Sequence, residues 1–590
     1  MLSILSMLSK SRYLRRVVLL CVGPTATFAC AVAVVSCASP PRQPEPQINV
    51  STTVAEEVEV PAVEITADLL YDILLGEIAH QRGEIEVSAQ ALVRAAETSR
   101  DPRIAERAAL LAVRARRYEE ALVAAELWRE LQPDSRAAME LLAGALLATE
   151  DIKGAEQQYR EMIESSGDEV GYMYRRIAQA ISRYGEGQEI LALMDRLIEL
   201  TPDNAEAHYS KAYIADSIDQ PDEAGRALDR ALELNPTWED AATAKAAHLM
   251  AQGQKAQVKD FSKAFLKKTP GANKLREQFA RFLVDFGERE EALSQFEQLA
   301  DRDPENADAL FTAALLGIQL EQLPEAADFL ERHLQLRPKN DQARVYLGQV
   351  SLELERFQSA KEVLSAVSQE SYYFEAQVLL GGVTAKLGTT EEALQHLQTL
   401  VPSSDEERVR LVLAEEQILR EANQLDRAKE ALDLGLSVLP DNSELLYARG
   451  LVAAQLSLIE LHEQDLRKLL EIDPGNAHAL NALGYTLADQ TDRHGEALDL
   501  ITQALELRPD DPFIMDSMGW VQYRLGNHAV AIDYLERALK TRPDAEIAAH
   551  LGEVLWVTGE RRRAESVWNR ALKESPLNDV LLGTIQKLKQ

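Results

Sequence analysis

The sequence predicts an all-α protein built from repeated helical hairpins, and three observations lead to this prediction. A proline recurs about every 34 residues, and small residues recur at fixed offsets from it. Between the prolines, leucine, alanine and isoleucine follow the spacing of one helix face. Aromatic residues make up only 6% of the 590 residues, which suits helices that pack closely through alanine. We therefore expect one solenoid rather than about four compact domains.

The first 36 residues are expected to be a secretory signal. A basic start precedes an apolar run over residues 17–35, and Ser36 stands before Cys37. The run ends in Val-Val-Ser-Cys, which resembles the bacterial lipobox. That resemblance implies cleavage before Cys37, a diacylglycerol on its thiol and a further acyl chain on its amino group. An uncleaved anchor is the alternative, because ~20 apolar residues can span a bilayer, and both Met1 and Met7 remain open as the start.

Residues 37–66 are expected to be a lipid-anchored tether. The segment begins with a proline-rich stretch that favours an extended backbone, and it shows no helical periodicity before Pro61. Residue 38 is Ala rather than Asp, and by resemblance to the sorting rule of Gram-negative lipoproteins this implies the outer membrane, facing the periplasm. Several acyl chains anchor a protein stably where one chain does not. Apart from this lipid on Cys37, no cofactor is expected.

The repeat is defined by prolines that follow the end of a helix. Successive spacings are 34 residues from Pro202 to Pro338, and 34, 35, 34 and 33 from Pro440 to Pro576. A small residue follows ten positions later, and alanine often follows at twenty-two. Two antiparallel helices approach closely only where small side chains face each other, and proline fits just beyond a helix end. The ten prolines are Pro202, Pro236, Pro270, Pro304, Pro338, Pro440, Pro474, Pro509, Pro543 and Pro576.

This pattern resembles the tetratricopeptide repeat (TPR) family, most clearly in the last three repeats. The resemblance implies a right-handed superhelical solenoid, with about fifteen helical hairpins in the repeat zone. We expect regular repeats over 201–338 and 441–576, and degenerate hairpins over 67–200 and 339–440. Residues 577–590 are expected to form a capping helix. The interval from Pro338 to Pro402 is 64 residues, four short of two repeats, which predicts altered turns there.

Composition and charge exclude several classes of function. The net charge of −33 argues against a broad nucleic-acid surface, which needs clustered lysine and arginine. All three cysteines lie within the first 37 residues, so the rest of the chain holds no disulfide and no cysteine-based zinc site. Catalytic signatures are absent, and the ten histidines are scattered without ligand spacing. We therefore predict a protein that is not an enzyme and holds no metal.

The family resemblance implies recognition of a protein partner along the first helix of each hairpin. Aromatic side chains often anchor such interfaces, although each one is alternatively a filler between hairpins. The family's carboxylate clamp needs Lys and Asn one turn apart; the matching pairs are Tyr447/Leu451, Asn481/Tyr485 and Asp516/Trp520, so chaperone-tail binding is not expected. The candidate partner-binding residues are Tyr209, Tyr213, Phe311, Tyr447, Asn481, Tyr485 and Trp520.

Charge is spread unevenly along the expected mature chain. Removing the signal deletes four positive charges and gives −37, of which −29 falls in residues 67–474. This acidic stretch either steers basic partners at low salt or only keeps the solenoid soluble. Arg561, Arg562 and Arg563 form a basic cluster near the C-terminus, where they either bind an acidic partner or cap the turn between the last two helices.

The whole layout of lipobox, tether and TPR array resembles the lipoprotein adaptors of carboxy-terminal processing proteases in pseudomonads. That resemblance implies a non-catalytic cell-envelope scaffold that binds a periplasmic protease and delivers substrates such as peptidoglycan hydrolases. Two alternatives stay open: a scaffold for exopolysaccharide export or outer-membrane assembly, and an enzyme with its site in 339–440. The sequence leaves self-association open and predicts no nucleic-acid partner.

Overall fold

The computed structural model describes residues 63–184 and 188–589. Over these residues the chain forms 31 α-helices, one short 3₁₀ turn and no strand, which confirms the predicted all-α fold. Cys37, the predicted signal and nearly all of the predicted tether lie outside the described residues. In the two described ranges, no helix combines the length and the hydropathy that a bilayer crossing requires.

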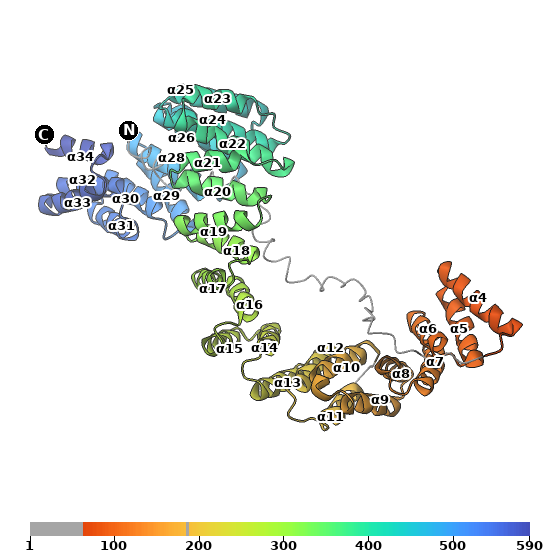
Figure 1. Ribbon diagram of the computed structural model, residues 1–590. Helices are drawn as coiled ribbons and strands as arrows, with labels where there is room; N and C mark the ends of the chain where they lie inside the picture. Colours follow the sequence, from red (N-terminus) through yellow and green to blue (C-terminus); the bar gives the residue numbers. More distant parts are fainter. Residues whose placement is uncertain (1–62, 185–187, 590) are drawn as a thin grey trace. The chain divides into compact units, whose positions relative to one another are not determined.

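The helices alternate as the two members of a hairpin. Even-numbered helices are the first helices and odd-numbered helices the second helices of fifteen hairpins, from α4/α5 to α32/α33, and α34 follows alone. Figure 1 shows successive helices side by side in chain order. The chain divides into two compact units, described separately, at Leu316/Gly317 inside α18.

The N-terminal unit contains the helices up to most of α18. Their bounds are α4 (Ala67–Gln81), α5 (Ile85–Ser99), α6 (Pro102–Arg114), α7 (Tyr118–Leu131), α8 (Arg136–Ala148), α9 (Ile152–Glu164), η1 (Gly167–Glu169), α10 (Val170–Tyr184), α11 (Glu189–Ile198), α12 (Ala205–Ser217), α13 (Pro221–Leu234), α14 (Glu239–Ala251), α15 (Lys255–Lys268), α16 (Asn273–Asp285), α17 (Arg289–Arg302) and α18 (Ala307–Gln319).

The C-terminal unit contains the remaining helices. Their bounds are α19 (Leu323–Leu336), α20 (Asp341–Glu353), α21 (Phe357–Ser365), α22 (Glu370–Leu387), α23 (Thr390–Gln398), α24 (Asp405–Glu421), α25 (Leu425–Val438), α26 (Ser443–Gln455), α27 (Ile459–Ile472), α28 (Ala477–Gln490), α29 (His494–Leu507), α30 (Pro512–Arg524), α31 (His528–Thr541), α32 (Ala545–Val557), α33 (Arg561–Glu574) and α34 (Asp579–Lys589).

The repeated prolines lie between a second helix and the next first helix, as the sequence predicts. In several repeats an asparagine two residues later caps the new helix. The side-chain oxygens of Asn204, Asn340 and Asn476 accept hydrogen bonds from the backbone N–H groups three residues on, at 3.0–3.1 Å. Each such cap contributes about 1 kcal/mol by satisfying a donor that the helix leaves free. In the Pro-x-Asn pattern, the proline therefore lies in the turn and the asparagine caps the helix that follows.

The small residue ten positions after the proline sets how closely the two helices of a hairpin approach. A Cβ atom added to Gly519 would lie 2.5 Å from Cγ of Leu535, which is buried in the second helix. The same relation joins Gly348 to Leu364, again sixteen residues on. Gly484 instead faces Ile501, seventeen residues on, because α28 has one residue more than the 13 of α26. This addition accounts for the single spacing of 35.

Residues 339–440 depart from the regular hairpin in helix length. The first helices α22 and α24 have 18 and 17 residues, whereas the second helices α21 and α23 have nine each. In α24 the position sixteen residues before the buried Leu432 carries Glu416 rather than a small residue. Its Oε1 accepts a hydrogen bond from Nε of Arg420 at 2.6 Å. Burial raises the pKa of Glu416, and the neighbouring guanidinium opposes that shift.

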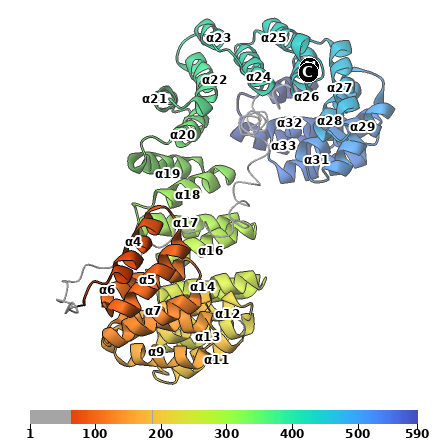
Figure 2. The same cartoon turned by 90° about the vertical axis from the view of Figure 1, so that its right-hand side faces the viewer.

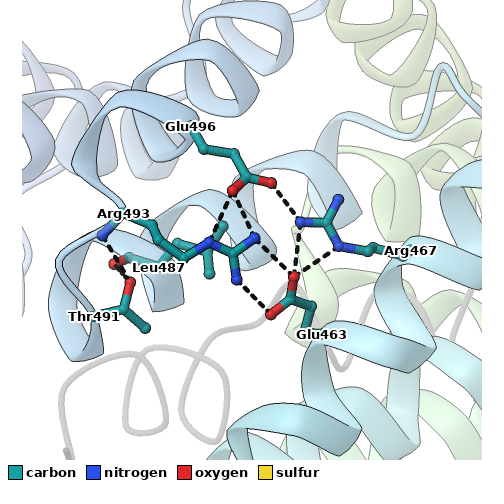
Figure 3. Close-up of polar contacts among 6 residues, drawn as sticks. All are labelled: Glu463, Arg467, Leu487, Thr491, Arg493 and Glu496. Atoms are coloured by element: carbon teal, nitrogen blue, oxygen red, sulfur yellow. Dashed lines mark hydrogen bonds and ion pairs between the residues drawn. The ribbon is translucent and has the colours of Figure 1, made fainter.

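Ion pairs join the second helices of successive hairpins on the outside of the C-terminal unit. Arg493 lies between Glu463 on α27 and Glu496 on α29, with N–O distances of 2.8 and 2.6 Å, and Arg467 contacts the same two carboxylates (Figure 3). Thr491 accepts a hydrogen bond from the backbone N–H of Arg493 at 3.1 Å. These two arginines and two glutamates form a network that fixes the register of the two hairpins. A single exposed ion pair, by comparison, contributes little.

Two adjacent glycines in α22 test the close-approach argument. A Cβ atom at Gly381 would lie 2.4 Å from Leu397, whereas a Cβ atom at Gly382 would have no neighbour within 4 Å. We expect Gly381→Ala to lower the free energy of unfolding by about 1–3 kcal/mol through overpacking. Gly382→Ala is the matched control and is expected to raise it by about 1 kcal/mol, because alanine favours helix. Urea unfolding measures both, and equal effects at the two positions would contradict the argument.

Candidate partner-binding surfaces

All seven candidate partner-binding residues lie on first helices. Many successive first helices pack against one another within a unit, for example α8 with α10 and α28 with α30 (Figure 1), and α14 with α16 (Figure 2). Side chains on the solvent-facing sides of such packed first helices lie on a shared surface. The structure places the candidates along this surface, but at very different depths.

In the N-terminal unit, Tyr213 on α12 is the most accessible candidate, with 53% of its surface exposed. Tyr209, one turn earlier, is partly buried because its ring lies 4.9 Å from that of Trp238. Burial raises the pKa of Tyr209, and the nearby carboxylate of Asp240 adds to that shift. Phe311 on α18 is partly buried. Tyr213 is thus positioned to contact a partner directly, whereas Tyr209 supports the interface between hairpins.

In the C-terminal unit, the aromatic candidates are buried within the array. Tyr485 is 2% exposed and Trp520 is 7% exposed, and both belong to the hydrophobic core of the unit. Tyr447 and Asn481 are partly buried, and Tyr447 packs against the same core. The side chains of Tyr485 and Trp520 fill the space between hairpins, which was the alternative reading of these residues. Access to them from solvent requires the hairpins to separate.

A buried polar cluster surrounds His550 on α32. Its Nδ1 lies 2.9 Å from Oδ2 of Asp516 on α30, and its Nε2 lies 3.3 Å from the hydroxyl of Tyr485 on α28. The imidazole also stacks on Trp520, with ring centroids 4.4 Å apart. Nε1 of Trp520 donates a hydrogen bond to Oδ1 of Asp489 at 3.2 Å. Three successive first helices are thus joined by one hydrogen-bonded and stacked group.

The charges around His550 favour its protonated form. Burial alone would lower the pKa of His550, but the carboxylate of Asp516, which is itself fully buried, outweighs this effect with help from Glu546 and Asp489. The net result is a pKa above the ordinary value of 6.5. A protonated imidazole donates from both ring nitrogens, so it satisfies Asp516 and Tyr485 together.

This cluster has no local sequence signature. His550 and Asp516 are 34 residues apart, and His550 and Tyr485 are 65 apart, so no local motif joins them. The signal that was available is the repeat period itself, because residues about one period apart occupy neighbouring first helices. Comparing polar residues at equal repeat positions would have brought His550 and Asp516 together.

The basic cluster near the C-terminus divides into three different environments. The guanidinium of Arg561 lies 4.9 Å from the ring centroid of Trp556, which favours a cation–π contact. Arg563 contacts Glu560 and Glu536, so it ties α33 to α31. Arg562 is exposed. All three arginines are exposed, and of the three only Arg563 has carboxylate contacts in the described part of the chain.

A groove of about 570 Å³ lies close to this cluster, among α31, α32 and α33. Its lining mixes cations such as Lys540 and Arg570 with the carboxylates of Asp544 and Glu574. Asp544 is already engaged as the cap of α32, where it accepts a backbone N–H at 2.8 Å. Over the described residues, no group of three or more His, Cys, Asp or Glu side chains has an arrangement that could hold a metal ion.

Comparison with known proteins agrees with the repeat geometry. Tetratricopeptide repeat family models match residues 106–169, 191–237, 278–341, 318–372 and 517–579. A TPR repeat-containing protein of Pseudomonas aeruginosa is 32% identical over 523 residues, which is 88% of each chain. Yeast Tom70 is 13% identical, with 88% of this chain and 99% of that chain covered and a TM-score of 0.32. A tetratricopeptide repeat protein from Parabacteroides merdae is 16% identical over 48% of this chain and 99% of that chain, with a TM-score of 0.32.

The fold and its surfaces define a helical-repeat protein of the kind that binds other proteins. The chain belongs to the tetratricopeptide repeat family. Members of this family are typically non-catalytic scaffolds for protein–protein interaction.

The pKa of His550 predicts how the C-terminal hairpins respond to pH. A pKa raised in the folded state stabilises the fold fully below the unfolded value of about 6.5, and this stabilisation is lost as pH rises through the folded pKa. We expect His550→Gln to weaken protection of α30 and α32 amides by about 3 kcal/mol at pH 6 and by less at pH 9.

Hydrogen exchange, corrected for intrinsic rates, measures this difference. His208→Gln on α12 serves as the control, because it lies outside the cluster and should leave α30 and α32 unchanged. An effect of His550→Gln that stays constant or grows between pH 6 and pH 9 would show that the ion pair with Asp516 is not its source.

Proposed function

We propose that this chain is a non-catalytic scaffold of the cell envelope, anchored to the outer membrane through lipid on Cys37 and facing the periplasm. The observation that carries the proposal is a lipobox cysteine placed shortly before a TPR array of fifteen hairpins. A lipid anchor fixes the protein at a surface, and a long array offers contacts to more than one partner. Neither feature is needed by a soluble enzyme.

The proposed partners are a periplasmic protease of the carboxy-terminal processing family and its substrates, such as peptidoglycan hydrolases. This part of the proposal rests on the order of a predicted signal, a tether and a TPR array that lacks the carboxylate clamp of chaperone-binding members. An array that holds protease and substrate together raises the effective concentration of one at the other, to the millimolar range for short flexible linkages. The chain would thereby accelerate cleavage without contributing a catalytic group.

Affinity capture from envelope extracts tests the choice of partner. We expect the tagged full-length chain to retain a carboxy-terminal processing protease together with at least one cell-wall hydrolase, identified by mass spectrometry. A tagged TPR protein of unrelated sequence serves as the control for nonspecific retention. Recovery of polysaccharide-export or outer-membrane assembly proteins in place of a protease would refute the adaptor role and favour the alternative scaffold.

Replacement of the predicted acylated cysteine tests the anchor separately. We expect Cys37→Ala to abolish incorporation of labelled fatty acid and to release or mislocalise the protein, while circular dichroism of the helical array stays unchanged. Cys30→Ala is the matched control within the signal and should retain the label. Fatty acid still incorporated into the Cys37→Ala variant would overturn the lipobox assignment.

A further inference from the structure

Arginines gather on one face of two first helices in the N-terminal unit. Arg103, Arg107 and Arg114 on α6 are spaced four and seven residues apart, which places them within about 40° around the helix axis. The same spacing recurs on α10 as Tyr172, Arg176 and Arg183. The opposite face of α6 carries the buried alanines that pack into the core. These six residues, together with Arg175, are named the basic face.

Several arginines of the basic face contact glutamates on neighbouring first helices. Arg176 on α10 donates a hydrogen bond to Glu140 on α8 at 2.6 Å. Arg175 on α10 lies 3.4 Å from Glu206 on α12. At the other end, Arg107 on α6 donates to Glu77 on α4 at 2.8 Å. The helices α6, α8 and α10 also pack against each other in that order, so their arginines share one surface.

The charge of these three helices is opposite to that of the chain. The first helices α6, α8 and α10 carry seven arginines and only two acidic residues, Glu106 and Glu140. Their partners in the hairpins, α7, α9 and α11, carry nine acidic and four basic residues. A chain of −33 thus presents a local basic surface. The seven arginines are Arg103, Arg107, Arg114, Arg136, Arg175, Arg176 and Arg183.

The cations of the basic face differ in how far they are already engaged, and Arg103 donates to both carboxylate oxygens of Asp101, at 3.0 and 2.6 Å. Arg114 and Arg183 are exposed and have no carboxylate partner among the described residues. The pairs of Arg107 and Arg176 with glutamates are half-exposed, and exposed pairs contribute only about 0–1 kcal/mol, so an incoming carboxylate can replace them. Tyr172 is 51% exposed and lies beside Arg176, with the guanidinium 5.8 Å from its ring centroid.

We propose that the basic face binds an extended acidic segment of a protein partner, a proposal that rests on the scaffold function above. Adjacent packed helices lie about 8–10 Å apart, and three residues of extended chain span about 10 Å. The rows of the basic face lie on α6 and α10 with α8 between them, so carboxylates six residues apart in an extended segment, about 20 Å, meet both rows. A segment with a carboxylate at every third residue contains such pairs. Arginine pairs with carboxylates through two parallel hydrogen bonds, and exposed tyrosine adds apolar contact.

The acidity of the rest of the chain does not prevent this binding. The Debye length is about 8 Å at physiological ionic strength, so charges on the far side of the hairpins are screened from the face. Nucleic acid is disfavoured as the ligand, because its long anionic backbone would extend beyond the face onto acidic hairpins. The occupant we assign is a partner's segment, although the tether of this chain, with Glu56, Glu57 and Glu59, is acidic as well.

A labelled peptide with glutamate at every third residue, separated by alanine and serine, tests the proposal on the full chain by fluorescence anisotropy. We expect binding that weakens with added salt, and no binding of the peptide with glutamine in place of glutamate. Arg114→Gln/Arg183→Gln is expected to weaken binding about tenfold. The matched control, Arg226→Gln/Arg230→Gln, removes two exposed arginines from the second helix α13 and should bind like the wild type.

Each contrary result overturns a stated part of the proposal. Equal loss in the two arginine pairs, or absence of peptide binding, would refute the basic face as the site. Competition by a single-stranded oligonucleotide at the same concentration would refute the assignment to protein. Binding seen only when Glu56, Glu57 and Glu59 are replaced by glutamine would show that the tether is the occupant.

The outcome is separable from that of the proposed function. If envelope capture still recovers the protease and hydrolase while the acidic peptide fails to bind, the scaffold role stands and the basic face is not its docking surface. If the peptide binds with the expected dependence on Arg114 and Arg183 but capture recovers neither protein, the face is a binding site and the adaptor role is wrong.

Discussion

The close approach of two helices at one small residue is the constraint on which the rest of the structure depends. Where glycine occupies that position, the second helix places a large side chain against the backbone of the first, as Leu535 does at Gly519 and Ile501 at Gly484. The pair then buries its apolar stripe against the next hairpin, since no hairpin has a core of its own. Proline and the asparagine cap fix the length of each turn, so the same geometry returns every 34 residues. Exceptions such as Glu416 mark the segment where helix lengths change.

Most of the fold could be predicted from the sequence because each of these local devices has a residue signature. The period, the small residues and the final helix are all visible in a single chain. The lengths of α21 to α24 were not predictable in the same way, because a degenerate repeat keeps the packing while its turns and helix ends shift. The sequence also does not reveal how deeply each first-helix side chain is buried. Tyr213 and Trp520 occupy similar sequence contexts, yet one is exposed and the other fills the space beside His550.

The difference in burial of first-helix side chains distinguishes the C-terminal unit from the N-terminal unit. In the C-terminal unit the first helices turn aromatic and polar groups toward one another, and the pair of His550 with Asp516 joins neighbouring hairpins through a buried charge. Breaking a buried pair of this kind costs about 3–5 kcal/mol, because it leaves one charge buried without a partner. In the N-terminal unit the corresponding positions on α6 and α10 carry arginines that remain in water. In the C-terminal unit the buried groups therefore hold α28, α30 and α32 together. In the N-terminal unit the arginines of α6 and α10 stay exposed to solvent.

In the hairpins from α6/α7 to α10/α11, the first helices taken together are basic and the second helices are acidic. The second helices of these hairpins lie away from the first-helix surface, so screening limits the effect of their acidic residues on the potential at that surface. Net charge computed for the whole chain averages these two surfaces and conceals the basic one. An acidic solenoid can thus present a basic face to a protein partner, because screening over about 8 Å lets the nearest rows of side chains determine the local potential.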